Sequence, residues 1–289
     1  MDDLKKINEH LNKVMNTYNK TGMPDFEGYS PDEMFYIFHK PFDLKSPIQF
    51  NQLAEADYKK IPMLNQVKYL LKIIDEKGEL KLTKKGFLPT KVVSELYKQG
   101  FIKEYMIESG ISKLYKETDS QSINLTRILA ELSGIVKKRK GSLSLTKKGK
   151  LIWNNNFNLL LLLFKTFANK FNWAYYDGYG ENNIGQAGYG FSLILLSKYG
   201  QKQRIDKFYA EKYFKAYPVL KDAIDEPGYA YFGSSANRCY SIRTFDRFLN
   251  YFGLINIESE DNWGSDKFIT KTELFDRLIN IKPHKNFTP

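Results

Sequence analysis

Residues 136–150 of this chain carry seven cations and no acid in the sequence VKKRKGSLSLTKKGK. The seven are Lys137, Lys138, Arg139, Lys140, Lys147, Lys148 and Lys150. Lysine and arginine side chains at this density can neutralise the phosphates of a nucleic acid, and such binding weakens as the salt concentration rises. A run of charge can equally be a solvated surface, so the place of the run in the fold decides which interpretation is favoured.

The excess of positive charge is concentrated around this run. The 289 residues have a net charge of +11, and residues 64–150 alone hold 19 basic against 9 acidic side chains. Residues 1–63 hold 8 and 10, and residues 151–289 hold 17 and 14. Only 7 of the 44 basic residues are arginine, which suggests an AT-rich coding sequence. A coding bias would spread lysine evenly, however, so the position of the charge is the informative feature.

A helix is predicted immediately before the run, over residues 118–135. Thr118 and Gln121 have the spacing of a capping box at its start, and apolar residues recur along it at helical spacing. The opposite face carries Gln121, Asn124 and Arg127. Side chains of these types near the start of a helix can bind base edges through paired hydrogen bonds. We therefore expect Asn124 and Arg127 to face bases and the cations to bind phosphates.

The elements that would position these side chains follow one another in a definite order. We expect helices over 64–76 and 89–99 with a short strand over 79–83 between them, then the helix 118–135, a hairpin over 136–146 and a further helix from Lys150. Gly141 supplies the turn of the hairpin. Helix, strand, helix, helix and a two-stranded wing is the order of a winged-helix unit.

The end of the hairpin, Leu143-Ser144-Leu145-Thr146-Lys147-Lys148-Gly149, resembles the junction between wing and last helix in bacterial winged-helix regulators. In that family the third helix enters the major groove and the wing contacts the backbone or the minor groove. The resemblance covers residues 64–155 and implies DNA contact through the helix 118–135 and the wing 136–150. The motif L-x-L-T-x-x-G also occurs at Leu80 to Gly86, which leaves an internal repeat as an alternative.

The amino-terminal half also resembles an uncharacterised bacterial family of unknown function. The resemblance lies in Ser30-Pro31-Asp32-Glu33-Met34, in Pro41-Phe42 with Ser46-Pro47, and in Leu82-Thr83-Lys84-Lys85-Gly86 with Leu88-Pro89. It implies that residues 24–150 belong together, and it implies no activity.

Residues 1–62 are interpreted as an N-terminal helical arm. An amphipathic helix over 4–19 is predicted by apolar residues three and four positions apart, namely Leu4, Ile7, Leu11, Val14, Met15 and Tyr18. Ser30 and Glu33 predict a capping box for a helix over 31–39. We expect a winged-helix unit with a basic wing over 63–155 and a second, winged-helix-like unit over 156–289.

The second unit is expected to repeat the winged-helix order. Its short strand is placed at 172–176, its third helix at 241–252 with Ser241 as N-cap, and its wing strands at 254–258 and 267–269. Arg243 and Arg247 lie one turn apart on the face expected to be exposed, so they are further candidates for nucleic-acid contact, with salt bridges to nearby Asp246 or glutamates as the alternative. Phosphates would repel the wing itself, because it carries Glu258, Glu260, Asp261 and Asp266.

Other chemistry is weakly represented in the sequence. Cys239 is the single cysteine and the histidines are scattered at 10, 39 and 284, so we expect no disulfide, no metal site and no cofactor. Acidic residues near His39 could support acid–base chemistry, but helix capping accounts for most of them: Asp25, Glu27, Asp32 and Glu33. We therefore do not expect an enzyme.

The fold class expected is mainly α with small β-hairpins (α+β), arranged as tandem winged-helix units behind a helical arm. The run from Leu159 to Phe164 is much shorter than the ~20 apolar residues of a membrane span, so we expect no membrane contact and a cytoplasmic location. The leading hypothesis is a bacterial protein that binds double-stranded DNA, for instance a transcriptional regulator. The alternative is a protein–protein interaction module built on winged-helix units, and a homo-oligomer is left open.

Overall fold

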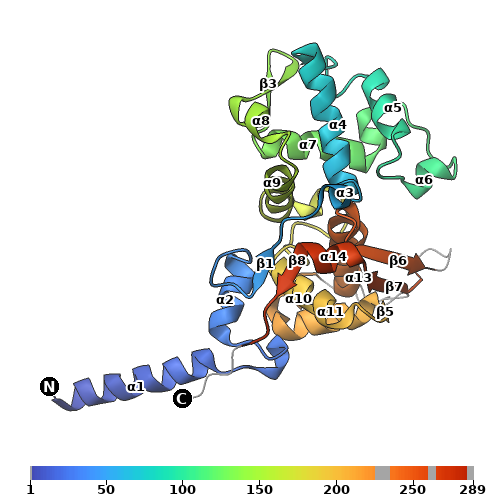
Figure 1. Cartoon of the computed structure of the whole chain (residues 1–289). Coiled ribbons are helices and arrows are strands. Elements are labelled where there is room, and N and C mark those ends of the chain that lie inside the picture. Colours follow the sequence, from blue (N-terminus) through green and yellow to red (C-terminus); the bar gives the residue numbers. More distant parts are fainter. Residues whose placement is uncertain (1, 225–234, 260–264, 285–289) are drawn as a thin grey trace. The chain divides into compact units, whose positions relative to one another are not determined.

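The computed structural model describes residues 2–224, 235–259 and 265–284 (Figure 1). They form helices and small antiparallel sheets, which confirms the expected α+β class. The chain divides into two compact units. Unit 1 comprises residues 1–51, 179–246 and 255–289, and unit 2 comprises residues 52–178 and 247–254. The boundaries between these units therefore differ from the domain boundaries expected after residues 62 and 155.

Unit 2 is mainly helical. Its elements are α3 (Glu55–Tyr58), α4 (Pro62–Lys77), β2 (Leu80–Lys81), α5 (Thr90–Lys98), α6 (Tyr105–Glu108), a 3-10 turn (Glu117–Asp119), α7 (Gln121–Leu132), β3 (Val136–Arg139), β4 (Ser142–Leu145), α8 (Lys147–Ile152), α9 (Asn156–Asn169) and a second 3-10 turn (Trp173–Tyr176). The apolar face predicted for the helix at 64–76 is buried in the core, as are Leu143 and Leu145 of β4. The helices and the hairpin expected between residues 64 and 150 are therefore present.

The three strands of unit 2 form an antiparallel sheet in the order β2-β4-β3. Leu143 pairs with Leu80 on one side and with Lys138 on the other. The hairpin turns at Lys140 and Gly141, whose φ angles are +48° and +74°. Two successive residues with positive φ form the tight turn whose twist matches that of paired strands, and glycine at the second position suits it.

Helix α7 lies inside unit 2 and is covered on more than one side. It packs against α4, α5 and α9, and seven of its twelve residues are buried. Its N-cap is Ser120, whose hydroxyl accepts the amide proton of Ile123, so the predicted capping box of Thr118 and Gln121 is wrong. The 3-10 turn at Glu117–Asp119 occupies the place where the helix was expected to begin.

Unit 1 combines helices with two small sheets. Its elements are α1 (Asp2–Lys20), a 3-10 turn (Pro24–Phe26), α2 (Pro31–His39), β1 (Ile48–Phe50), α10 (Tyr189–Tyr199), β5 (Arg204–Ile205), α11 (Asp206–Ala216), α12 (Pro218–Lys221), α13 (Ser235–Ser241), β6 (Ile255–Ser259), β7 (Lys267–Lys271), α14 (Glu273–Leu278) and β8 (Ile279–Ile281). The sheets have the orders β5-β7-β6 and β1-β8. The predicted capping box of α2, between Ser30 and Glu33, is confirmed.

Two local predictions for the carboxy-terminal half are wrong. Residues 172–176 form a 3-10 turn instead of a strand, because the side chain of Asn172 caps it and the indole of Trp173 donates to the carbonyl of Phe167. The short strand is β5, which pairs with β7. Ser241 is not an N-cap, since α13 continues through it into a π-helix, Ile242–Leu249. Glu260 and Asp261 of the predicted acidic wing lie outside the described residues.

Among the described residues, no helix combines the length and the apolar character that crossing a bilayer requires.

Candidate nucleic-acid interface

The register of the sheet in unit 2 places cations on its solvent-facing side. In β4 the buried Leu143 and Leu145 alternate with Ser142 and Ser144, so the two serines face solvent. Ser142 pairs with Lys81 of β2 and with Arg139 of β3, and Ser144 pairs with Lys137 of β3. Directly paired residues share a face of a sheet. The small serine side chains of the central strand are therefore flanked by cations on both outer strands.

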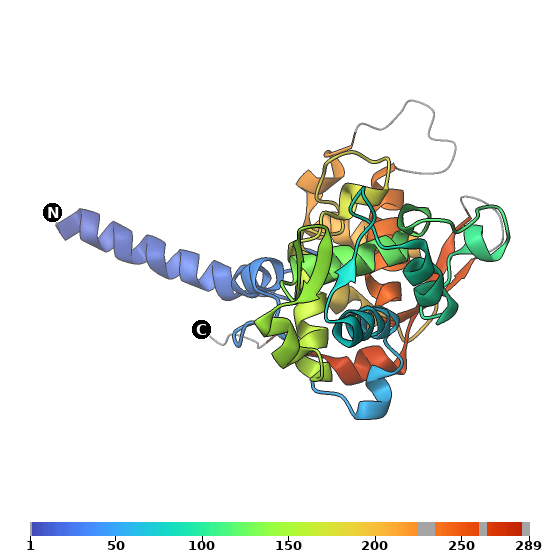
Figure 2. The same ribbon diagram turned by 90° about the horizontal axis from the view of Figure 1, so that it is seen from above.

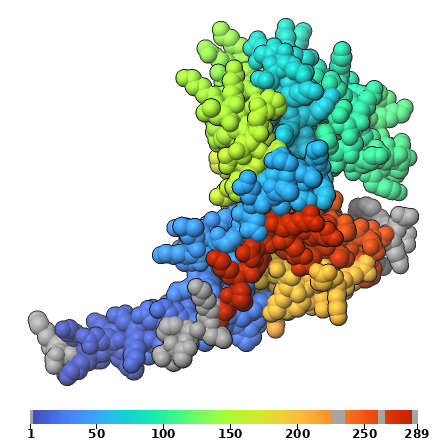
Figure 3. All heavy atoms as spheres, in the orientation of Figure 1, coloured from blue at the N-terminus to red at the C-terminus, as the bar shows by residue number. Residues whose placement is uncertain are grey.

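More cations surround the turn of the hairpin. Lys140 occupies the turn itself, and Lys84 and Lys85 form a second turn just after β2. The backbone amide of Leu82 donates to the carbonyl of Gly141 at 2.8 Å, which holds the two turns together. Lys138 joins them, because its ammonium group donates to the carbonyl of Gly86 at 3.2 Å. Figure 1 labels β3 of this hairpin, and Figure 3 shows yellow-green side chains projecting at this edge of unit 2.

We call these seven side chains the basic cluster: Lys81, Lys84, Lys85, Lys137, Lys138, Arg139 and Lys140. Each of them is exposed. In the described part of the chain, no carboxylate lies within ion-pair distance of any of them. Glu79, next to β2, is an exposed acid at the border of the cluster. The expected placement of Lys137 to Lys140 on an exposed hairpin is therefore confirmed, whereas their binding to phosphates stays a prediction.

The three lysines of α8 lie beyond the base of the hairpin. Lys147, Lys148 and Lys150 are exposed, and Lys148 donates to the carbonyl of Ser133 at 2.9 Å. That hydrogen bond directs the ammonium group of Lys148 toward the end of α7. Lys147 and Lys150 can extend the positive surface at this end.

Asn124 and Arg127 do not face solvent as predicted. Asn124 is 5% exposed, its amide donates to Glu117 at 2.5 Å, and its carbonyl oxygen accepts from the hydroxyl of Tyr176 at 2.5 Å. The Arg127 side chain is 12% exposed and is paired with Glu117 at 2.7 Å and with Glu131. The prediction was wrong because the face opposite the apolar residues of α7 is itself covered.

Glu117 is the centre of this buried network and is fully buried. Besides the two side chains of α7, it accepts the backbone amide of Leu88 at 2.6 Å. Burial alone would lower the pKa of Arg127, but Glu117 and Glu131 outweigh it and raise that pKa above its ordinary value, so the guanidinium stays charged. Gln121 is the one polar residue of α7 whose side chain is exposed. These contacts are structural, and they leave α7 little with which to read bases.

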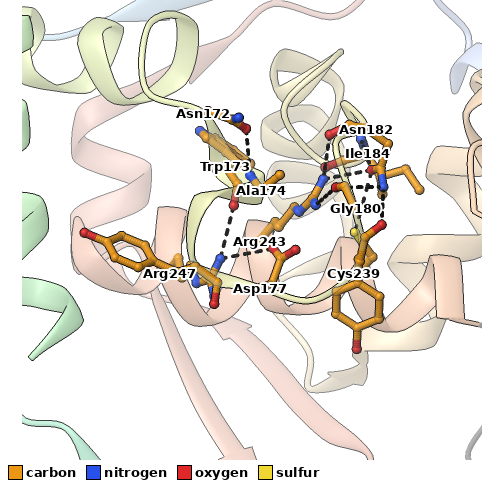
Figure 4. Close-up of polar contacts among 12 residues, drawn as sticks. Asn172, Trp173, Ala174, Asp177, Gly180, Asn182, Ile184, Cys239, Arg243 and Arg247 are labelled. Atoms are coloured by element: carbon orange, nitrogen blue, oxygen red, sulfur yellow. Dashed lines mark hydrogen bonds and ion pairs between the residues drawn. The ribbon is translucent and has the colours of Figure 1, made fainter. Parts of the chain in front are cut away.

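Arg243 is also buried, although it was expected on an exposed face. Its guanidinium donates to the carbonyls of Gly180, Asn182 and Ile184 and to the side-chain oxygen of Asn182 (Figure 4). The fixed fork of guanidinium donors suits several acceptors at once. Arg243 therefore holds the loop of residues 180–184 in place.

Arg247 has a similar role in unit 2. It is 7% exposed, donates to the carbonyls of Trp173 and Tyr176, and pairs with Asp177 at 3.2 Å (Figure 4). Arg247 thus forms a salt bridge, with Asp177 as the partner where Asp246 or a glutamate had been expected. Neither arginine is available to nucleic acid. Both guanidinium groups are buried, and their N–H groups already donate to acceptors within the protein.

The acidic residues of the amino-terminal arm are engaged in separate local contacts. Glu33 caps α2 and lies 2.6 Å from the Nδ1 atom of His284. Glu27 binds Lys198 and Lys212 and accepts the hydroxyl proton of Tyr199. His39 is exposed, and its ring is tilted against Phe35 and edge-on to Phe38. Across the described residues, no group of three or more His, Cys, Asp or Glu side chains could hold a metal ion.

One sequence signal could have revealed that α7 is covered. Helix α9 is apolar on nearly all sides, with Leu159, Leu160, Leu163, Phe164 and Phe167 all buried. A helix that is apolar all round is buried between other elements and has no free polar face. Such a helix, which follows the hairpin after the short α8, must pack against other elements on more than one side, and α7 is one of them.

Comparison with known families gives one match. The family model of the Y4jL N-terminal domain, a family of unknown function, matches residues 59–158. This range contains α4 to α8, the basic cluster and the network around Glu117. No curated protein and no solved structure matches the chain. The match includes Leu82 to Pro89, one of the motifs on which similarity to a family of unknown function was expected, whereas the motifs at residues 30–34 and 41–47 lie outside it.

Proposed function

We propose that the chain binds double-stranded nucleic acid, and DNA in particular, through the basic cluster of unit 2. The observation that carries this proposal is the gathering of seven exposed cations on one sheet and its turns, with no carboxylate partner among the described residues. Like charges at this spacing repel one another, and a polyanion laid against them removes the repulsion and releases its own counterions. A bacterial cytoplasm is the location that such a partner implies.

The order of the elements supports a winged-helix interpretation of residues 62–152. α4, β2, α5, α7 and the β3–β4 hairpin follow one another, and the sheet order is β2-β4-β3. A similar order recurs from α10 to β7, with the sheet order β5-β7-β6. In this interpretation two such units stand in tandem, and the β3–β4 hairpin is the wing of the first.

The proposed contact is with backbone phosphates instead of base edges. Asn124 and Arg127 are occupied inside unit 2, which leaves Gln121 as the exposed polar side chain of α7. The hydroxyls of Ser142 and Ser144 lie between the cations and can donate to phosphate oxygens. Contacts of this kind fix position on the duplex and carry no sequence information. We therefore expect binding with little dependence on base sequence.

The proposal is tested by fluorescence anisotropy with two labelled duplexes of unrelated sequence, at 50 and 200 mM salt. For about five phosphate contacts, the affinity should fall about 500-fold between these concentrations, since log K changes by ~0.9 per contact for each decade of salt. The two duplexes should bind within a few-fold of each other. Absence of binding at 50 mM, or binding that salt does not weaken, would overturn the proposal.

A protein partner is the second candidate, because one segment of unit 2 exposes several apolar side chains. They are Tyr105, Met106, Ile111 and Tyr115, which are 69%, 48%, 63% and 64% exposed. Exposed apolar residues gathered in one segment mark interaction surfaces. If the protein does not bind duplexes but a cross-linkable group placed at Tyr105 captures a defined protein in cells, this second function is the one supported.

A further inference from the structure

Helix α1 presents an uncovered row of apolar side chains. Each residue from 3 to 18 is exposed, and Figures 1 and 2 show the helix extending away from the other elements of unit 1. The row consists of Leu4 (68% exposed), Ile7 (54%), Leu11 (51%), Val14 (52%), Met15 (59%) and Tyr18 (58%). Soluble helices normally bury such a row against a neighbouring element.

The spacing of the row is that of a helix that pairs with another helix. Positions 4, 7, 11, 14 and 18 are separated alternately by three and four residues, which is the repeat of the a and d positions of a coiled coil. A strict two-in-seven stripe is narrower than the face with which a helix covers a globular core. Met15 widens it on one side, at an e position. The partner that fits this seam is therefore a second α-helix.

The charges of α1 favour a second copy of the same helix. The residues that flank the seam are Asp3, Asn8, His10 and Thr17. They do not form a row of like charges, so two copies of α1 would not repel each other along the seam. They also give no reason to prefer a partner helix of opposite charge. The outer face carries Lys5, Lys6, Lys13 and Lys20 beside Glu9. Helices that lie on membrane surfaces also carry lysines on their polar face, so vesicle binding is one outcome of the test below.

The area of the row is enough for a reversible dimer. At their exposed fractions the six side chains offer on the order of 600 Å² per copy, so a pair would bury about 1,200 Å², the lower limit of specific interfaces. A lone helix of this length is marginally stable in water, and pairing would also stabilise its fold. We propose that two copies of the protein associate through their α1 helices, in the micromolar concentration range.

Sedimentation velocity of the full-length protein between 2 and 200 µM tests this proposal. The mass should rise with concentration from 33.8 kDa toward twice that value. Leu11→Glu puts a charge in the middle of the seam and should leave the protein monomeric at all concentrations. Asn12→Glu adds the same charge at the next residue, on the outer face, and should dimerise like the wild type. Leu11 lies on the exposed row, so both variants should keep the thermal unfolding transition of the wild type, and Leu11→Glu should lose at most the helical circular dichroism signal of α1 itself.

Three outcomes would overturn the proposal. The first is a wild-type mass of 33.8 kDa at 200 µM. The second is a dimer that Leu11→Glu leaves intact. The third is a monomer whose binding to vesicles of phosphatidylcholine and phosphatidylglycerol is abolished by Leu11→Glu, which would assign α1 to a membrane surface. None of these measurements involves nucleic acid, so dimerisation stands or fails independently of the function proposed above.

Discussion

Replacing Lys137 and Arg139 together with alanine tests the role of the basic cluster most directly. Both side chains project from the solvent face of β3, and their strand partners are the small residues Ser144 and Ser142. Neither packs in the core, so the variant should fold with an unchanged unfolding temperature. If each side chain neutralises one phosphate, the slope of log K against log salt becomes less steep by about 1.8. With equal affinities at 1 M salt, the loss is about 60-fold at 0.1 M and about 9-fold at 0.3 M.

Anisotropy titrations of one duplex at four salt concentrations measure both the slope and the affinities. The matched control is the variant with Lys98 and Lys103 changed to alanine, which removes the same formal charge from α5 and the segment after it. The control should keep the wild-type slope, with at most a few-fold change in affinity from the lower net charge. An unchanged slope in the Lys137/Arg139 variant, or an equal change in the control, would refute the reasoning.

Three further variants probe local features. Lys140→Asn removes a cation and places at φ +48° a residue that tolerates the left-handed region. Thermal melting should therefore show a stability equal to that of the wild type or up to about 1 kcal/mol higher. Duplex affinity at 0.1 M salt should fall about 8-fold. Glu117→Gln turns an amide N–H toward one of the three groups that donate to Glu117 and removes a charge beside Arg127. The free energy of unfolding measured in urea should fall by about 3 kcal/mol, and a fall below about 1 kcal/mol would contradict the role of this network. Burial would raise the pKa of Glu27, but hydrogen bonds from Lys198, Lys212 and Tyr199 hold it below its ordinary value of 4.5. The Glu27 carboxylate therefore stabilises the fold above pH 4.5, and this contribution is lost as the pH falls through the lowered pKa. The difference in unfolding free energy between wild type and Glu27→Gln should shrink on acidification. A difference that stays constant with pH would contradict this assignment.

The hairpin was predictable because its signals are local. Leu143 and Leu145 alternate with serines, and Gly141 can adopt the positive φ that a two-residue turn requires. Helices α4 and α5 could likewise be predicted from the spacing of their apolar residues. Strand β5 could not, because its two residues run directly into α11 and show no alternation, whereas β2, equally short, was predicted from the alternating residues 79–83.

The orientation of α7 was not predictable from its own residues. Asn124 and Arg127 satisfy the pattern of a polar helix face, and only their contacts with Tyr176 and Glu117 show that the face is interior. Arg243 and Arg247 were expected on an exposed face, and both are buried. Each guanidinium binds backbone carbonyls and a side-chain oxygen at once, which an ammonium group does less well when buried.

The pairing of β1 with β8 constrains how the chain can fold during synthesis. Ile48 pairs with Ile281, and the hydroxyl of Tyr29 donates to the carbonyl of Lys282, 253 positions away. On the ribosome, residues 29 and 48–50 can form these contacts only after residues 279–282 have been translated, whereas nearly all of unit 2 lies in one continuous stretch. Domains fold as they emerge and distant contacts form slowly. Unit 2 is thus able to assemble first, and unit 1 closes only when the whole described chain has been made.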